Sequence, residues 1–457
     1  MRRLLAICAF GLAIAVAVVE ARGGDPERGY RLLLEKAYLP PDFHQEVFDE
    51  VWRQWPEPLR VQAEKATLAQ RRRMAYSRYG LTPRPGGQGQ ESPDDPGPPL
   101  QYVVQEDGHW VMNCFSCHGG KVAGRVIPGL PNSHYLLHTL SEEIRATKLA
   151  MEKPLTRMEL GSMVIPLGTT RGATNAVIFG VALMANRDPD LNVSTQITVP
   201  PMTHHDMDAP PWWHFRKKSH LYIDGFAQRG HRGLMQFMLV KQNGPEKFRE
   251  WEADFRDVFA YLESLEAPPY PFAIDQELAA QGERIFVRHC AECHGSYGKE
   301  ETYPNRLVPI EEIGTDRARL DALSVAARER YAQSWFGEYG EQDTRLNPGG
   351  YVAPPLDGVW ASAPYFHNGS VPTLWHVLHP TERPTIWRRR SEDGYDQEKV
   401  GLEIEIVDKI PTAALLSSER REYFDTRRFG KSAAGHDFPD ALTPEEKRAV
   451  LEYLKTL

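Results

Sequence analysis

Two five-residue runs decide the fold of this chain: Cys290-Ala291-Glu292-Cys293-His294 and Cys114-Phe115-Ser116-Cys117-His118. Both read C-x-x-C-H, the pattern that attaches a c-type haem. On a helical turn the first, fourth and fifth positions share one face, so both sulfurs and the imidazole can meet one porphyrin. We therefore expect two covalent c-type haems. The attachment residues would be Cys114, Cys117, Cys290 and Cys293, and the proximal iron ligands would be His118 and His294.

The cysteine count supports this interpretation. The chain has five cysteines, of which Cys8 lies in a leader and the other four all lie in the two motifs. No cysteine of the mature chain remains for a disulfide. The alternative is a pair of zinc or dithiol sites, because a lone C-x-x-C is more often of that kind. Two matches that use every cysteine of an exported chain favour haem.

Residues 1–21 are predicted to be a secretory signal peptide, with Arg2-Arg3, an apolar run over 4–19 and a small-residue cleavage site. The alternative is an uncleaved membrane anchor, although the apolar run is short for a span. We expect a periplasmic or secreted protein, since bacteria attach c-type haem outside the cytoplasm. The net charge of -8 argues against nucleic acid as a partner and leaves the oligomeric state open.

The length of 457 residues is enough for two or three domains. We predict a mainly α fold, with two cytochrome c-like haem domains, loop-rich insertions and a few short β-hairpins. An N-terminal helical segment and a Pro/Gly linker occupy 22–99, with the linker at 80–99. The first haem domain spans 100–267. The second cytochrome c domain, with an insertion, spans 268–457, and the boundary falls at Pro268-Pro269.

Each haem motif has its own predicted setting. The first follows a hairpin, because 101–106 and 109–113 flank Asp107-Gly108, a preferred turn pair. The second follows a helix that Asp275 caps. On that helix Gly282 would let another helix approach, and Phe286 would pack on the haem. A matching last helix begins with a capping box at Thr443.

The sixth iron ligand decides the chemistry, because a haem with an open position can bind peroxide or dioxygen. For the second haem we favour His436, which follows small residues just before the last helix; the alternative is a surface-loop histidine. For the first haem no convincing ligand is found. His134 on a Gly/Pro loop is one candidate, and the cluster of His204, His205 and Asp206 could act on the distal side. Further candidates are the thioethers of Met163, Met202 and Met207, although methionine is more often a core filler.

One later stretch resembles a known signature. It reads Pro354-Pro355-Leu356-Asp357-Gly358-Val359-Trp360-Ala361-Ser362-Ala363-Pro364-Tyr365-Phe366-His367-Asn368-Gly369-Ser370-Val371-Pro372. It is similar to that of the bacterial di-haem cytochrome c peroxidase superfamily, closest to the rubber-oxygenase-like branch. The resemblance covers roughly 100–457. The chain is much shorter than the rubber oxygenases, so their polymer cleavage does not follow. His134 resembles the displaceable distal histidine of the peroxidases.

The resemblance implies a division of labour. The N-terminal haem would be reactive, and the C-terminal haem would be a six-coordinate electron relay with His436 as its second axial ligand. Trp213 would match an aromatic between the haems, Phe226 would line the distal pocket of the first haem, and His367 would be a pocket residue rather than an iron ligand. Some members hold calcium between the domains, so calcium is a candidate cofactor.

Three functions are open at this stage. The first is an exported di-haem oxidoreductase that acts on peroxide, dioxygen or a small-molecule substrate. Peroxide reduction needs a distal acid or base, whereas dioxygen chemistry on an apolar substrate would want an apolar pocket near Phe226. The second is a pure electron-transfer di-haem cytochrome c. The third is an accessory or sensor cytochrome. All three imply a redox partner protein, as electron donor or acceptor.

Overall fold

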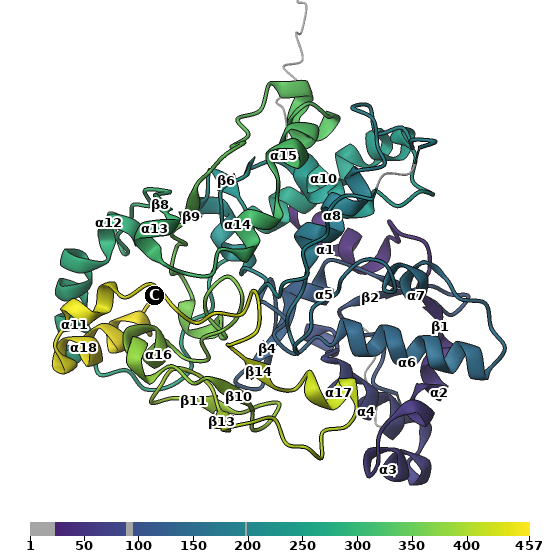
Figure 1. Cartoon of the computed structure of the whole chain (residues 1–457), viewed down its shortest axis with the longest axis horizontal. Coiled ribbons are helices and arrows are strands. Elements are labelled where there is room, and N and C mark those ends of the chain that lie inside the picture. Colours follow the sequence, from purple (N-terminus) through teal and green to yellow (C-terminus); the bar gives the residue numbers. More distant parts are fainter. Residues whose placement is uncertain (1–22, 88–94, 197–198) are drawn as a thin grey trace, which may run out of the picture.

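The computed structural model describes residues 23–87, 95–196 and 199–457. Helices dominate, and the strands are short and antiparallel (Figure 1). The prediction of a mainly α fold with a few short hairpins is confirmed. The predicted signal peptide lies outside the described residues, and so does Cys8. In the described part of the chain, no helix is both long enough and apolar enough to cross a membrane.

The N-terminal half of the chain carries the first haem motif on α5. Its elements are, in chain order, α1 (Pro26–Glu35), β1 (Phe43–His44), α2 (Gln45–Glu50), η1 (Val51–Gln54), α3 (Leu59–Lys65), α4 (Leu68–Tyr79), η2 (Pro85–Gly87), β2 (Tyr102–Val104), β3 (His109–Met112), α5 (Phe115–His118), β4 (Gly119–Val122), β5 (Arg125–Pro128), α6 (Leu137–Ala150), α7 (Arg157–Gly161), α8 (Ala176–Met184), η3 (Trp212–Lys217), β6 (His220–Leu221), β7 (Ala227–Gln228), α9 (His231–Leu234), η4 (Met235–Met238) and α10 (Pro245–Ser264).

The hairpin predicted before the first motif is present. Strands β2 and β3 pair with Tyr102 opposite Met112, and the turn residue Gly108 has a φ of +85°. Strand β1 pairs with the other edge of β3, which gives a three-stranded sheet in the order β1-β3-β2. Because β3 ends two residues before Cys114, the sheet fixes where the first motif begins.

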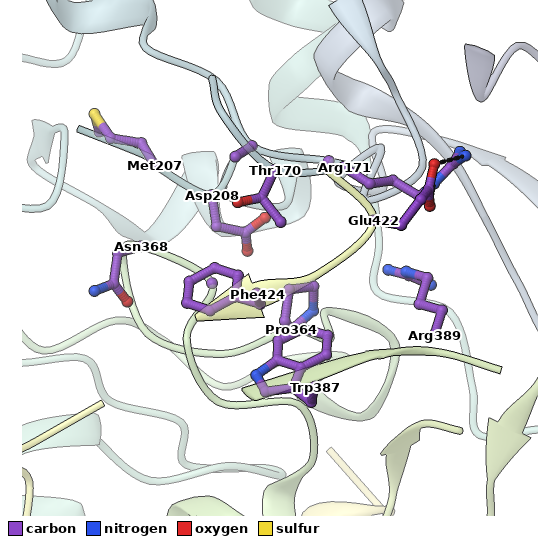
Figure 2. A pocket seen from close by; sticks show the side chains of 13 residues that line it. Thr170, Arg171, Met207, Asp208, Pro364, Asn368, Trp387, Arg389, Glu422 and Phe424 are labelled. Carbon is purple, nitrogen blue, oxygen red and sulfur yellow. Dashed lines mark hydrogen bonds and ion pairs between the residues drawn. The ribbon is translucent and has the colours of Figure 1, made fainter. Parts of the chain in front are cut away.

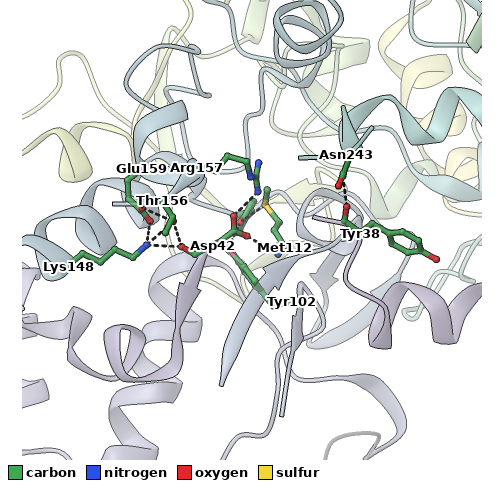
Figure 3. Close-up of polar contacts among 10 residues, drawn as sticks. Tyr38, Asp42, Tyr102, Met112, Lys148, Thr156, Arg157, Glu159 and Asn243 are labelled. Carbon is green, nitrogen blue, oxygen red and sulfur yellow. Dashed lines mark hydrogen bonds and ion pairs between the residues drawn. The ribbon is translucent and has the colours of Figure 1, made fainter. Parts of the chain in front are cut away.

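A buried polar network ties this sheet to α6 and α7 (Figure 3). The Asp42 side chain is fully buried and accepts hydrogen bonds from the Met112 amide at 2.9 Å and from Arg157 at 2.8 Å. Lys148 donates to Glu159 and to the Asp42 carbonyl, both at 2.8 Å. A buried ion pair is tolerated when its remaining polar atoms are bonded. The network therefore holds the sheet in one position relative to the helices behind it.

The segment before residue 100 packs directly on the first haem domain. Helix α1 lies against α10 so closely that a Cβ on Gly29 would be 2.1 Å from the Asp257 carbonyl oxygen. Asp254 on α10 accepts hydrogen bonds from Lys36 at 2.6 Å and from the Tyr38 hydroxyl at 3.1 Å. The N-terminal helices are therefore part of the same packed body as the first motif.

The C-terminal half carries the second haem motif and ends at the left of Figure 1. Its elements are α11 (Gln276–His289), α12 (Ala291–His294), β8 (Leu307–Pro309), α13 (Ile310–Ile313), α14 (Ala318–Ala322), α15 (Val325–Ala332), η5 (Trp335–Gly340), β9 (Gly350–Val352), η6 (Val359–Ala361), α16 (Leu374–Leu378), η7 (Pro380–Glu382), β10 (Ile386–Arg389), β11 (Tyr395–Asp396), β12 (Gly401–Leu402), β13 (Ile404–Ile406), α17 (Ser417–Arg420), β14 (Phe424–Asp425), η8 (Phe438–Ala441) and α18 (Pro444–Leu454).

Helices α11 and α18 pack against each other beside the second motif, as the sequence predicted. Asp275 caps α11 by accepting hydrogen bonds from two backbone amides, and Thr443 forms the capping box of α18. A Cβ on Gly282 would be 1.9 Å from the Ala449 carbonyl oxygen, so only glycine permits this approach. Phe286 is 1% exposed and lies one helical turn before Cys290. The pair of helices therefore sets the position of the second motif.

The insertion after the second motif packs against elements of the N-terminal half of the chain. Helix α15 packs against α8, next to which it lies in Figure 1, and η5 packs against α9. Buried side chains of this insertion belong to the apolar core that also contains Phe115 and Trp212; they are Leu323, Tyr331, Trp335 and Phe336. The two haem regions are thus joined by a shared core as well as by the chain.

Gly282→Ala should destabilise the folded protein by about 1–3 kcal/mol, because the added methyl meets a backbone carbonyl that has no room to move. The matched control is Gly161→Ala on α7, where nothing lies within 4 Å of the added atom. That change should be neutral or stabilise by up to about 1 kcal/mol. Thermal unfolding followed by helicity compares the two. Equal midpoints for both variants would contradict the close packing of α11 on α18.

Candidate haem-binding sites

Both motif histidines are oriented in the same way. His118 on α5 donates from Nδ1 to the Pro210 carbonyl at 3.0 Å, and His294 on α12 donates from Nδ1 to the Pro354 carbonyl at 2.8 Å. Each acceptor is the first residue of a Pro-Pro pair. A neutral imidazole has one donor and one acceptor nitrogen. In both histidines Nε2 therefore keeps its lone pair, as a metal ligand requires.

Electrostatics keeps these two side chains in the ligand form. Burial lowers the pKa of His118 to about 4, against a smaller opposing effect of the hydrogen bond to Pro210. Burial also lowers the pKa of His294. A histidine must be neutral to bind a metal. Both imidazoles are therefore ready to accept an iron at neutral pH.

The motif thiols do not resemble zinc-binding or reactive dithiol cysteines. All four are free, and burial raises the pKa of Cys114 to about 12 and that of Cys117 to about 11. A reactive or metal-binding cysteine is instead stabilised as the thiolate. Among the described residues, no group of three or more His, Cys, Asp or Glu side chains converges to hold a metal ion. At neutral pH Cys114 and Cys117 are therefore thiols and not thiolates.

At the second site, His436 faces the proximal histidine. The ring centroids of His294 and His436 are 6.2 Å apart. Two metal–imidazole bonds of about 2 Å each, together with the ring radii, span a similar distance. Neither ring nitrogen of His436 hydrogen-bonds to another described residue, and Nδ1 is buried. Burial, and then the charges of His294 and Arg383, lower the pKa of His436 to about 3, so it is neutral.

The backbone around His436 is held in an unusual conformation. His436 has a φ of +55° and Gly435 has a φ of +80°, both in the left-handed region. The His436 amide donates to the Ile313 carbonyl at 2.7 Å, and Arg383 donates to the Gly435 carbonyl at 2.7 Å. A non-glycine residue in this region is strained and persists only where its surroundings fix it. The fold therefore holds His436 over His294.

The first site has no such partner. In the described part of the chain, the only ring in contact with His118 is that of Trp212, stacked at 4.9 Å with an interplanar angle of 24°. An indole offers no lone pair to a metal. The next residue, Trp213, points into the other core and donates from Nε1 to the Asp357 carbonyl at 2.7 Å. Since Asp357 is three residues after Pro354, the two adjacent indoles link the surroundings of both proximal histidines.

The predicted loop histidine, His134, is turned towards the second half of the chain. It is 5% exposed and donates from Nε2 to the Glu392 carbonyl at 2.8 Å. Burial, and then the charges of Arg389 and Arg171, lower its pKa well below the usual range. Among the described residues, no recorded contact joins His134 to His118.

The cluster of His204, His205 and Asp206 does not act as a unit. His204 is exposed and its Nε2 donates to the Leu167 carbonyl at 2.6 Å. Asp206 is buried and paired with Lys431 at 2.7 Å. His205 is 2% exposed, and its Nε2 has no hydrogen-bond partner among the described residues. Only His205 keeps an unused polar atom in a buried place.

Phe226 and His367 occupy different surroundings. Phe226 is buried in the core that contains Trp212, and its ring lies 4.9 Å from that of Tyr331. His367 stacks at a tilt on Tyr351, 4.6 Å away, and burial lowers its pKa to about 3. No contact of either residue with a motif histidine is recorded in the described chain.

Sequence reasoning missed Asp208, which lies two residues before Pro210. Its side chain projects into a pocket of about 410 Å³ that is partly open to solvent, whereas Met207 points away from this pocket (Figure 2). Burial raises the pKa of Asp208 well above the usual range, although Arg389 opposes this. A carboxyl group with a raised pKa is suited to donate a proton.

Sequence reasoning also missed the proline carbonyls that hold His118 and His294, although the paired prolines at 210–211 and 354–355 were visible. The residue before a proline is restricted to an extended conformation. The chain has six Pro-Pro pairs, at 40–41, 98–99, 200–201, 210–211, 268–269 and 354–355, so the pairs alone do not single out these two carbonyls.

Curated relatives match part of the chain. Protein y4iM of Sinorhizobium fredii is 30% identical over 261 residues, covering 50% of this chain and 56% of the relative. Protein y4iJ of the same organism is 32% identical over 250 residues, covering 40% of this chain and 39% of the relative. The chain thus spans about half the length of the curated relatives that it matches.

Among solved structures, a MauG-like protein associated with microbial copper homeostasis is 16% identical, covering 61% of this chain and 89% of that one. Its TM-score is 0.29, which is too low to support a shared fold.

The stretch that contains the Pro-Tyr-x-His signature gives the clearest match. Residues 350–388 match the RoxA-like, cytochrome c-like family. They include the carbonyl of Pro354 that orients His294, as well as His367. The match falls on the segment that carried the resemblance in the sequence. Over this segment the chain is similar to the RoxA-like, cytochrome c-like family.

Proposed function

We propose that the protein is an exported di-haem c-type cytochrome that acts as an oxidoreductase on peroxide or dioxygen. The first site, Cys114, Cys117 and His118, would hold the reactive haem. The second site, Cys290, Cys293, His294 and His436, would hold a six-coordinate haem that relays electrons. A redox protein outside the cytoplasm would supply or accept the electrons. Calcium between the domains stays a prediction.

The observation that carries this proposal is the difference between the two proximal histidines. His294 is faced by a neutral, strained histidine, whereas the ring that touches His118 is an indole that cannot bind iron. When bound, a haem with two strong protein ligands transfers electrons, and one with a free position binds peroxide or dioxygen. The chain's own residues would divide the two tasks in this way.

A proton source supports peroxide as the substrate. Peroxide reduction needs an acid that moves a proton between the two oxygens. Of the predicted donors, Asp206 is bound to Lys431 and His204 lies at the surface. Asp208 is the better candidate, because burial raises the pKa of its carboxyl and it lies on the segment that leads to Pro210. Its side chain would hold the proton at a carboxyl oxygen.

A pure electron-transfer cytochrome is the second candidate, and Met207 is the observation that favours it. Met207 pairs through its backbone with Thr174, whose side chain contacts the Cys117 thiol. A thioether so close to the attachment residues could bind the first iron as a sixth ligand. Met207→Leu would then convert the first haem to high spin, whereas under our proposal it leaves the spin state unchanged.

Adding peroxide to the half-reduced protein tests the proposal. We expect the absorption spectrum of the first haem to change within the mixing time, because its sixth position is free. The second haem should respond only by oxidation. Two haems that stay low-spin and ignore peroxide, in both the oxidised and the half-reduced protein, would overturn the enzymatic proposal in favour of electron transfer alone.

His436→Ala should turn the second haem from low to high spin, because it removes the ring that faces His294. Absorption spectra and electron paramagnetic resonance of the oxidised variant measure the change. His134→Ala is the matched control, since that histidine bonds to the Glu392 carbonyl and should leave both spectra as they are. A low-spin spectrum that survives His436→Ala would rule out His436 as the ligand.

Trp213→Phe should slow electron transfer between the haems several-fold, because it breaks the indole bridge and the hydrogen bond to Asp357. The rate is measured by reducing one haem rapidly and following the other. Trp375→Phe is the control, as that indole bonds to Glu382 away from both motifs. Equal rates in both variants would remove Trp213 from the relay.

A further inference from the structure

Around the turn at 218–225, side chains from both halves of the chain bring together far more positive than negative charge. We call it the basic turn and define it as Lys218, Asp224, Arg319, Arg328 and Arg345. Asp224 is fully buried, and its carboxylate pairs with Arg328 at 2.6 Å and with Arg319 at 3.1 Å. Both of these arginines are 1% exposed. In the described part of the chain, no carboxylate lies within 4 Å of the side-chain nitrogens of Arg345 or Lys218, so one acid stands among four cations.

Two of the four cations also have unused donors. Nε of Arg319 and one terminal nitrogen of Arg345 are buried and have no hydrogen-bond partner among the described residues. Arg328 differs, because its guanidinium also donates to the Leu323 carbonyl at 3.2 Å and to the Arg345 carbonyl at 3.5 Å. Among the residues that the structure describes, the ammonium of Lys218 donates only to the Tyr222 carbonyl, at 3.4 Å.

Buried charge of one sign is costly unless it is paired. An isolated buried ion destabilises the folded state strongly, and an unused buried donor adds roughly 1–3 kcal/mol. Protein carboxylates within reach neutralise only part of the charge here. Burial also lowers the pKa of Lys218 to about 8, although Asp224 opposes this. The basic turn is therefore a site for an anion that the chain does not supply itself.

The backbone links the basic turn to a segment beside each proximal histidine. At one end, Lys218 directly follows η3, which carries the indole of Trp212 stacked on His118. At the other end, the Val352 amide donates to the Ile223 carbonyl at 2.6 Å. Val352 is two residues before Pro354, whose carbonyl orients His294. An anion bound here would belong to a group that lies near one of the haem-binding motifs.

The turn is also shaped for close approach. Tyr222 and Gly225 have φ values of +67° and +60°, in the left-handed region. A Cβ on Gly225 would be 2.6 Å from a terminal nitrogen of Arg345, so glycine leaves room for that guanidinium. The strained turn thus leaves room for the Arg345 guanidinium against Gly225.

We propose that the basic turn binds propionate carboxylates of the haems, with Arg319 and Arg345 as the positioning residues that hold them. This rests on the proposed function, because it requires haem at the two motifs. A guanidinium suits the task, since its planar fork of donors matches a carboxylate. Arg319 would contribute Nε, Arg345 a terminal nitrogen, and Asp224 would keep the arginines in place.

Resonance Raman spectra and reductive titrations of the holoprotein test this proposal. The variants are Arg319→Met, Arg345→Met and Arg345→Lys. We expect both methionine variants to shift the hydrogen-bond-sensitive propionate bending band and to lower the reduction potential of the affected haem, because the carboxylate loses its cation. Arg345→Lys should restore the potential and leave the band shifted, since it keeps the charge but not the fork.

Arg328→Met is the matched control. It removes the same charge from the same turn, but the protein itself partners its guanidinium. It should leave the propionate band unchanged. Arg345 is half-buried, so we expect its variants to fold. They can therefore test the proposal even if Arg319→Met fails to fold.

Two results would overturn the proposal. One is an unshifted band in the methionine variants while both haems remain attached. The other is a wild-type potential that moves with added chloride, acetate or phosphate, which would identify the anion as one taken from solution. The peroxide response of the unaltered protein is scored separately, so a failure here is distinguishable from a failure of the proposed function.

Discussion

Each motif histidine donates a hydrogen bond from Nδ1 to the carbonyl of a proline, and the orientation of both rings depends on that bond. It leaves Nε2 with a lone pair, and it fixes the plane of the ring. A proline locks its own φ, and a following proline holds the residue before it extended. A Pro-Pro pair therefore restricts the backbone and keeps its first carbonyl directed at one imidazole nitrogen.

Both sites have this hydrogen bond to a proline carbonyl, and they differ in the ring that contacts the motif histidine. At the second site His436 has a strained backbone conformation, which hydrogen bonds with Ile313 and Arg383 hold in place. At the first site the contact is an indole stacked on the proximal ring. The adjacent Trp213 reaches the Asp357 carbonyl near the other proline carbonyl. One pair of neighbouring tryptophans therefore connects the surroundings of the two motif histidines.

Sequence patterns predicted what depends on neighbours along the chain. The hairpin before Cys114, the cap at Asp275 and the capping box at Thr443 follow from turn and capping chemistry, and the close contact at Gly282 follows from helical spacing. Contacts made across long separations were not predictable in this way. A hydrogen bond from a side chain to a distant carbonyl leaves no periodic signal, and neither does the surplus of cations around Asp224. Such features depend on tertiary packing.

Under our proposal the two haems are unequal. His436 would bind one iron, and no protein ligand would lie opposite His118 on the other. Electron paramagnetic resonance of the fully oxidised protein at low temperature, with the spins counted, tests this most directly. We expect one low-spin and one high-spin ferric signal in equal amounts. Two low-spin signals, with no high-spin iron, would contradict the claim.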